Sequence, residues 1–195
     1  MATEVRSDLV NHPYFLVIDI WELHPQTRAK IRRTRLINSY DNKIGPGTVY
    51  QGDIDSNRRA IDDIDWEPLI QGRTILLGDF NAHSPIWNPL ITQSTDATSL
   101  EAIINRFDLI FNNEPGVITR PNLTRNKSII DLTFTTTAIG LLDSWAIEEE
   151  NPTPSDHELI VFSWNDLKQN RLDKRPKDIT GWNIDKLLLD QEKRE

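Results

Sequence analysis

The sequence contains no cysteine in its 195 residues. This absence excludes disulfide bonds, zinc sites built on thiolates and a cysteine nucleophile. Any bound metal ion must therefore be held by oxygen atoms or by imidazole nitrogen. Thirty acidic residues and four histidines are present to supply such ligands.

Long apolar segments and nucleotide-binding loops are also missing. No apolar run approaches the roughly 18 residues that a membrane span requires. The N-terminal residues, which include Glu4, Arg6 and Asp8, differ from a secretory signal. Neither a G-x-G-x-x-G motif nor a P-loop occurs, which argues against a nucleotide cofactor. We therefore expect an intracellular protein that has no membrane partner.

Positive charge is scarce overall but locally concentrated. Thirty acidic residues against 22 basic ones give a net charge of −8, which argues mildly against tight, sequence-independent binding to nucleic acid. Five basic residues nevertheless lie between Arg28 and Arg35. This basic run suits a solvated hairpin tip, which composition alone favours, or a surface that faces a phosphate backbone.

The apolar pattern predicts one domain, since 37% of the residues are hydrophobic and can form a sizeable core. Helical periodicity is expected within 57–70 and 98–107, and short apolar strands are expected at 14–21, 34–40, 73–80, 128–136, 143–150 and 157–164. The first two strands suit a hairpin. Strands that alternate with helices early and run together late indicate a mixed α/β (α+β) fold. We predict a domain over 1–165, followed by a charged linker or tail over 166–195.

Polar residues lie at the edges of three of these strands. Asp79 and Asn81 follow "ILLG", Asp131 interrupts "SIIDLTF", and Asp156 and His157 precede "ELIVF". Acids are costly to bury unless they are paired, hydrogen-bonded or bound to metal, so each cluster is a candidate site. Each also has a structural interpretation: an Asx turn for the first, a strand-edge acid facing solvent for the second, and a turn with an incidental histidine for the third.

Together the three clusters suit cleavage of a phosphate ester. One carboxylate would fix the tautomer of His157, and the ring would stabilise the charge that develops on the phosphorane. Asp79 can align or deprotonate a water molecule, and the Asn81 amide can hold a phosphate oxygen. A divalent cation held by carboxylates would neutralise charge on the leaving oxygen. The pattern therefore predicts metal-assisted phosphodiester hydrolysis.

Four segments carry a resemblance to a known superfamily: "LINSYDN", "GDFNAHSPIW", "SIIDLTF" and "SDHELIVF". They resemble the endonuclease/exonuclease/phosphatase superfamily, and most closely the apurinic-type endonuclease domain of non-LTR retrotransposons, over residues 14–165. The resemblance implies a four-layer α/β/β/α sandwich that nicks DNA with Mg²⁺, or with Mn²⁺ as the alternative metal. DNA is thus the expected partner and the nucleus the expected location, and no protein partner is evident.

The resemblance also implies a role for each matching residue of the catalytic motifs. Asp79 would orient or deprotonate the attacking water, and Asn81 would contact the phosphate and the transition state. His157 would bind the phosphate, while Asp131 would orient His157.

Three further residues match the motifs of the family. Asp156 would lie near the metal ion. Tyr40 would contact the scissile phosphate, and Ser128 would line the DNA-binding face.

The N-terminal motifs of the family have no counterpart in the sequence. Complete domains open with a strand that ends in a functional Asn and carry a metal-ligating Glu before the counterpart of "FLVIDIW", and neither Glu4 nor Glu22 lies in such a motif. We therefore expect a sandwich that is incomplete at its N-terminus and a weakened metal site. The alternative to an endonuclease is a non-catalytic truncated remnant or binding module, and a lipid or inositol phosphate phosphodiesterase is the alternative among enzymes.

Overall fold

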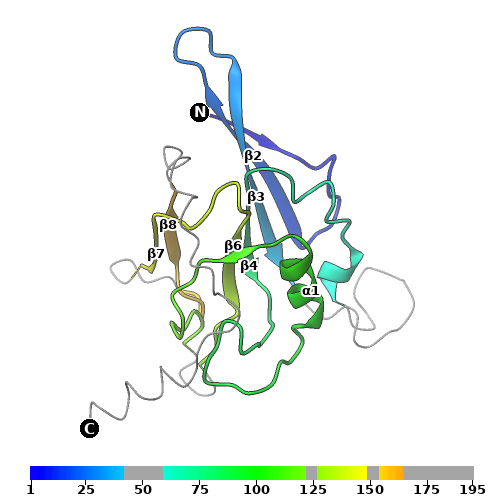
Figure 1. The fold of residues 1–195 in the computed structure, drawn as a ribbon, viewed down its shortest axis with the longest axis vertical. Coiled ribbons are helices and arrows are strands. Elements are labelled where there is room, and N and C mark those ends of the chain that lie inside the picture. The colour runs from blue at the N-terminus through cyan, green and yellow to red at the C-terminus, as the bar shows by residue number, and fades with distance from the viewer. Residues whose placement is uncertain (42–58, 122–126, 149–153, 165–195) are drawn as a thin grey trace. The chain divides into compact units, whose positions relative to one another are not determined.

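The computed structural model describes residues 1–41, 59–121, 127–148 and 154–164 (Figure 1). The chain divides into two units, residues 1–164 and 165–195. The second unit lies outside the described residues, and so does the predicted tail at 166–195. The predicted domain boundary therefore stays a prediction.

A six-stranded mixed sheet is the main element of the first unit (Figure 1). Its strand order is β1-β2-β3-β4-β6-β5, and among these strands only β3 and β4 pair in parallel. The strands are β1 (Ala2–Val5), β2 (Phe15–Leu23), β3 (Lys30–Tyr40), β4 (Thr74–Asp79), β5 (Ile110–Phe111) and β6 (Asp131–Thr135). The predicted antiparallel hairpin is confirmed as β2 and β3.

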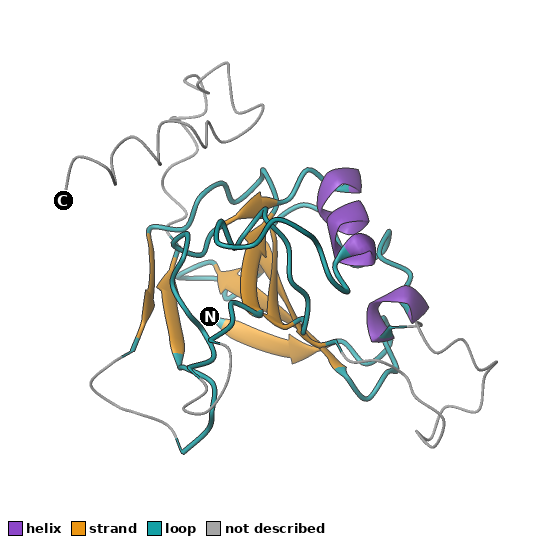
Figure 2. Cartoon of the chain, turned by 90° about the horizontal axis from the view of Figure 1, so that it is seen from below, coloured by secondary structure: helices purple, strands orange, loops and turns teal. Residues whose placement is uncertain are grey.

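A second sheet and two helices flank this main sheet. Strands β7 (Ser144–Ile147) and β8 (Ile160–Ser163) form an antiparallel pair. Figure 2 shows this pair on one side of the main sheet, with helix α1 (Thr98–Arg106) and the 3₁₀ helix η1 (Ala60–Asp63) on the other. The described residues thus form a mixed main sheet with mostly β-structure and one α-helix, whereas the predicted four-layer sandwich stays a prediction. In the described part of the chain, no helix is long and apolar enough to span a membrane.

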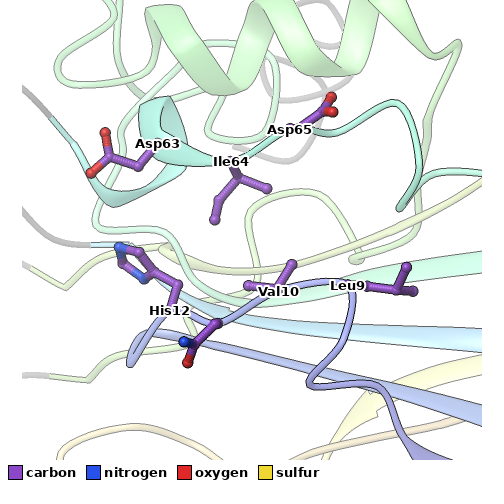
Figure 3. Close-up of a pocket in the computed structure, with 7 residues that line it drawn as sticks. Leu9, Val10, His12, Asp63, Ile64 and Asp65 are labelled. Atoms are coloured by element: carbon purple, nitrogen blue, oxygen red, sulfur yellow. The ribbon is translucent and has the colours of Figure 1, made fainter.

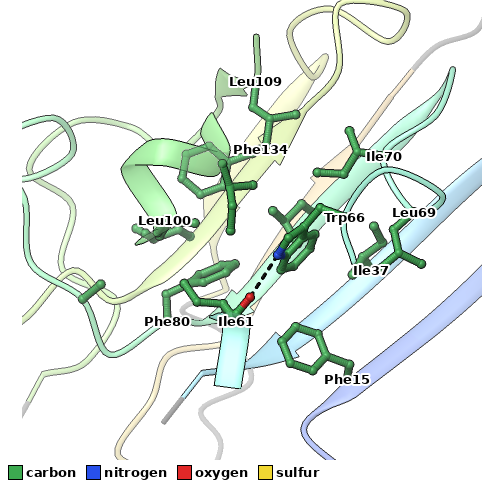
Figure 4. Packing of buried hydrophobic residues seen from close by; sticks show 14 of the residues in the cluster. Phe15, Ile37, Ile61, Trp66, Leu69, Ile70, Phe80, Leu100, Leu109 and Phe134 are labelled. Atoms are coloured by element: carbon green, nitrogen blue, oxygen red, sulfur yellow. Dashed lines mark hydrogen bonds between the residues drawn. The ribbon is translucent and has the colours of Figure 1, made fainter. Parts of the chain in front are cut away.

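The core lies between the main sheet and the two helices (Figure 4). Leu100 from α1, Ile61 from η1 and Phe134 from β6 are almost completely buried in it. Trp66 joins the same cluster, and its indole nitrogen donates a hydrogen bond of 3.0 Å to the carbonyl of Ile61. Because this bond satisfies the polar atom of a large buried ring, Trp66 can fill the core without a desolvation penalty for its N–H group.

The basic run between Arg28 and Arg35 lies on the β2–β3 hairpin, where four of its five basic residues pair with acidic residues of β1 and β2. The pairs are Lys30–Glu4 and Arg32–Glu22 at 2.8 Å each, Arg35–Asp19 at 2.7 Å and Arg33–Asp19 at 3.8 Å. These pairs favour the hairpin interpretation over a surface that faces phosphate. They also place Glu4 and Glu22 in ion pairs of the hairpin.

Candidate active site

Three of the predicted site residues lie at the same end of neighbouring strands of the main sheet, because β3 and β4 end at Tyr40 and Asp79 and the antiparallel β6 begins at Asp131. In the parallel pair of β3 and β4, Tyr40 lies opposite Asp79. In the antiparallel pair of β4 and β6, Asp79 lies opposite Asp131. Residues that are far apart in the sequence therefore become direct neighbours across adjacent strands.

The turn after β4 determines how Asp79 and Asn81 are presented. The backbone N–H of Asn81 donates a hydrogen bond of 3.0 Å to Asp79 Oδ1, and Asn81 has a positive φ of 43°. This is the geometry of an Asx turn, in which the side chain of Asp79 replaces a backbone acceptor. Between the two residues, the ring of Phe80 is completely buried and anchors the turn to the core. The Asx-turn interpretation is therefore correct for the backbone, and the turn leaves Asp79 Oδ2 for other contacts.

His157 forms a hydrogen-bonded pair with Asp131. Its Nδ1 lies 2.9 Å from Asp131 Oδ2 and 3.0 Å from Oδ1. The carboxylate therefore accepts a hydrogen bond from the Nδ1–H group and orients the ring. The other ring nitrogen, Nε2, lies 3.8 Å from Asp79 Oδ2 and also 3.8 Å from Asp156 Oδ1. The structure thus brings four of the predicted residues, Asp79, Asp131, Asp156 and His157, together around one imidazole ring.

Arg120, which is not among the predicted site residues, completes this cluster. Its Nη2 lies 2.6 Å from Asp156 Oδ2, and its Nε donates a hydrogen bond of 2.8 Å to the same oxygen. No periodicity or motif distinguishes Arg120 in the sequence, because its partner lies 36 residues further along the chain. The cluster therefore contains three acidic side chains, one arginine and one histidine.

Burial and charge act differently on the carboxyl groups of the cluster. Burial raises the pKa of Asp79, and the neighbouring charge of Asp131 raises it further, while the N–H of Asn81 and the charge of His157 act in the opposite direction. The hydrogen bond from Arg120 lowers the pKa of Asp156. Asp79 thus needs added positive charge to remain ionised more than Asp156 does.

Thr119 connects the strand of Asp131 with the loop of His157. It is completely buried, and its hydroxyl oxygen accepts hydrogen bonds from the backbone N–H groups of Ile130 at 3.1 Å and Asp131 at 3.0 Å. Its carbonyl accepts a third bond of 2.8 Å from the N–H of Glu158. One buried threonine therefore positions both members of the Asp131–His157 pair.

A buried ion pair supports the Asx turn from behind. Arg59 Nε donates to Asp41 Oδ2 at 2.8 Å, and Arg59 Nη2 donates to the carbonyl of Phe80 at 2.7 Å. The backbone N–H of Asp41 donates a hydrogen bond of 2.7 Å to the carbonyl of Asp79. The carbonyl of Asp41 accepts one of 3.1 Å from the side-chain amide of Asn81. The sequence does not reveal this pair, because its contacts arise only when β3 and β4 lie side by side.

The two remaining predicted residues lie at the margin of the cluster. Tyr40 is about half exposed beside Asp79. Its ring packs edge-on against the ring of Tyr14, with 5.8 Å between the ring centroids. Ser128 exchanges two backbone hydrogen bonds with Arg120, at 3.0 and 3.1 Å, so it lies next to the arginine of the site. The DNA-facing roles of both residues stay predictions.

The side chains present suit a hard divalent cation. Ligand atoms of Asp79, Asp131 and His157 all lie within 4.8 Å of one another. Asp156 Oδ1, which lies 3.8 Å from Nε2 of His157, adds a further carboxylate oxygen near this group. Mg²⁺ prefers such oxygen ligands and is commonly bound by one or two carboxylates together with substrate phosphates.

A cavity of about 390 Å³ lies away from this cluster. Figure 3 shows its lining side chains, which include His12 and Ile64 and none of the predicted site residues. The candidate active site therefore does not coincide with this cavity, and its side chains range from 13% exposed in Asp79 to 54% exposed in Asp156.

Comparisons with known proteins identify the family of this chain and show a similar fold. A family model described as "Endonuclease-reverse transcriptase" matches residues 36–161. A solved structure titled "Endonuclease domain of TRAS1, a telomere-specific non-LTR retrotransposon" is 23% identical, with a TM-score of 0.62 over 89% of this chain and 70% of that chain. The structural similarity shows a shared fold. No curated protein sequence matches the chain.

Proposed function

The chain belongs to the endonuclease-reverse transcriptase family, and from this premise we propose that it nicks DNA by metal-assisted hydrolysis of a phosphodiester bond. A single observation carries the proposal: His157 is held by Asp131 through Nδ1, while its Nε2 faces Asp79 and Asp156 at 3.8 Å. A phosphate that approaches Nε2 would meet an oriented imidazole and two carboxylates at once.

In this proposal each side chain has one task. Asp131 keeps the His157 ring in place, so that Nε2 can donate a hydrogen bond to a phosphate oxygen when the ring is protonated. Asp79 aligns and deprotonates the attacking water with the oxygen that the Asx turn does not use. The amide of Asn81, oriented by its bond to Asp41, contacts the phosphate.

Charge explains why a metal ion belongs to the proposal. Asp79, Asp131 and Asp156 bring three negative charges to the site, against one from Arg120 and at most one from His157. A phosphodiester is itself an anion, so added positive charge is needed for it to bind. Asp156 would help to hold Mg²⁺, or Mn²⁺ in its place, and the cation would neutralise charge on the leaving oxygen.

The fold and location proposed here follow from the same family. We place the chain in the four-layer α/β/β/α sandwich, because α1 and the β7–β8 pair lie on opposite sides of the main sheet. We also propose that the domain derives from a non-LTR retrotransposon, in line with the structure to which it is similar. Its site of action would then be nuclear DNA.

One observation favours a non-catalytic binding module as the second candidate function. The candidate metal ligands found in the described residues are Asp79, Asp131 and His157, and this group contains no glutamate. A cation held without a further carboxylate would bind weakly. The two candidates differ in a direct measurement of hydrolysis.

The deciding experiment measures nicking of supercoiled plasmid DNA by the full 195-residue chain, with Mg²⁺, with Mn²⁺ and with a chelator. We expect metal-dependent nicking that falls by about 10²–10⁴-fold in Asp79→Asn, because the general base is lost. Glu114→Gln, which removes the same charge from an exposed residue, serves as the matched control.

The opposite outcomes are equally clear. A folded chain that does not nick DNA with either metal would support the binding module. Nicking that persists in Asp79→Asn would place the activity elsewhere. Hydrolysis of phosphatidylinositol without hydrolysis of DNA would support the lipid phosphodiesterase.

A further inference from the structure

We infer that Arg120 is a phosphate-binding residue that Asp156 holds back until a cation takes over the Asp156 carboxylate. The inference rests on the proposed function and adds a residue that the family motifs quoted above do not include. It makes metal binding and phosphate binding depend on each other through one ion pair.

The geometry of the ion pair leaves half of the Asp156 carboxylate available. Both donors of Arg120, Nε at 2.8 Å and Nη2 at 2.6 Å, converge on the single oxygen Oδ2. The other oxygen, Oδ1, lies 3.8 Å from His157 Nε2, and the same ring nitrogen lies 3.8 Å from Asp79 Oδ2. A cation can therefore first contact Asp156 through Oδ1 and then compete with Arg120 for the carboxylate.

Solvent exposure allows the pair to open. The side chains of Arg120 and Asp156 are 35% and 54% exposed, unlike those of the buried pair Arg59–Asp41, which are 5% and 0% exposed. Exposed ion pairs contribute little to stability, so exchanging Asp156 for another anion costs Arg120 little. Breaking a buried pair such as Arg59–Asp41 would instead leave an uncompensated charge.

The backbone of Arg120 is fixed, so only its side chain has to move. Its N–H and carbonyl both bond to the backbone of Ser128, and the preceding Thr119 is bonded to the strand that begins at Asp131. The guanidinium therefore stays tethered within the same cluster whichever anion it binds. The backbone of Ser128 therefore holds Arg120 in place.

Charge makes Arg120 a suitable ligand for phosphate. Its hydrogen bond to Asp156, followed by the charges of Asp156, Asp79 and Asp131, raises the pKa of Arg120, so it stays protonated. A guanidinium presents several donors in a plane and binds phosphate oxygens in pairs. As long as Asp156 accepts hydrogen bonds from Arg120, Arg120 has less net charge and fewer N–H donors available for phosphate than it would have alone.

A double-mutant cycle on phosphate binding tests this inference without requiring catalysis. Inorganic phosphate is titrated by NMR into the full chain in the presence of a chelator, for the wild type, Arg120→Gln, Asp156→Ala and the double variant. In the wild type, Arg120 is engaged by Asp156, so Arg120→Gln should change the dissociation constant less than about twofold. In the Asp156→Ala background Arg120 is released, and the same substitution should weaken phosphate binding about tenfold. Arg106→Gln, which removes an arginine paired with Glu67, is the matched control and should change neither constant.

An additive double-mutant cycle would contradict the inference. If Arg120 acted only through its overall charge, Arg120→Gln would weaken binding equally in both backgrounds. If Arg120→Gln fails to fold, Arg120→Lys replaces it with the same expected direction, because lysine keeps the charge and loses the planar set of donors.

The cycle also separates this inference from the proposed function. An additive cycle, with phosphate binding that His157→Gln still weakens, would overturn the role of Arg120 and leave the phosphodiesterase site intact. Failure of every variant to bind phosphate would count against both.

Discussion

Gly78 is the residue at which a single methyl group should disrupt both the fold and the site. It lies in β4, directly before Asp79, with a φ of +141°. A Cβ atom at this position would lie 1.9 Å from the carbonyl oxygen of Ser39, and 2.7 and 2.8 Å from its backbone carbon and nitrogen. Ser39 is the β3 residue paired with Gly78, and Leu132 of β6 is paired with it on the other side. Alanine therefore cannot be accommodated unless β3 and β4 move apart.

The cost of Gly78→Ala has two parts. A non-glycine residue at this φ carries backbone strain of about 1–3 kcal/mol. The contact with the backbone of Ser39 adds an overpacking cost of about 1–3 kcal/mol, because no flexible side chain can move aside. We expect the free energy of unfolding to fall by about 2–6 kcal/mol, which is a large share of the roughly 5–15 kcal/mol that holds a domain together.

Urea denaturation of Gly78→Ala and of Gly72→Ala, followed by tryptophan fluorescence and circular dichroism, tests this value. Gly72 also has a positive φ, +62°, but a Cβ there meets nothing within 4 Å. Gly72→Ala should therefore lose only the backbone term of about 1–2 kcal/mol. If Gly78→Ala is no less stable than Gly72→Ala, the close approach of β3 to β4 is not as described, and the reasoning from strand pairing to site geometry fails with it.

Two further predictions concern residues of the site. Because burial raises the pKa of Asp79, the folded chain binds more protons than the unfolded chain between the ordinary and the raised pKa, and wild-type stability should fall as the pH rises through that range. Asp79→Asn should thus be more stable than the wild type at pH 7, and the advantage should shrink as the pH falls through the raised pKa towards the ordinary value of about 4; equal urea midpoints at pH 7 would contradict this. Thr119→Val should lower the free energy of unfolding by about 1–3 kcal/mol, because it leaves the N–H groups of Ile130 and Asp131 without their acceptor. Thr119→Ser keeps the hydroxyl, so a loss as large as that of Thr119→Val would show that the methyl group, not the hydrogen bonds, is responsible.

Local sequence patterns suffice for most of the secondary structure. The short apolar runs at 14–21 and 34–40 appear as β2 and β3, and the helical spacing of 98–107 appears as α1. The spacing of apolar residues within a segment indicates which of them face the core, so each of these elements can be predicted from its own segment. The residues of the Asp-x-Asn and Asp-His motifs are likewise visible in the sequence, because each motif is a short, contiguous pattern.

Contacts between distant segments required the tertiary structure. The register of β1, β2 and β3 determined that the basic run pairs with Glu4, Asp19 and Glu22. Pairing of β3 with β4 also brought Asp41 next to the turn of Asp79, and packing of loops from distant parts of the chain brought Arg59 onto Asp41 and Arg120 onto Asp156. A side chain's partner across a sheet depends on alignment and not on spacing along the chain, so the sequence could name Asp79, Asp131 and His157 but not the charges that surround and hold them.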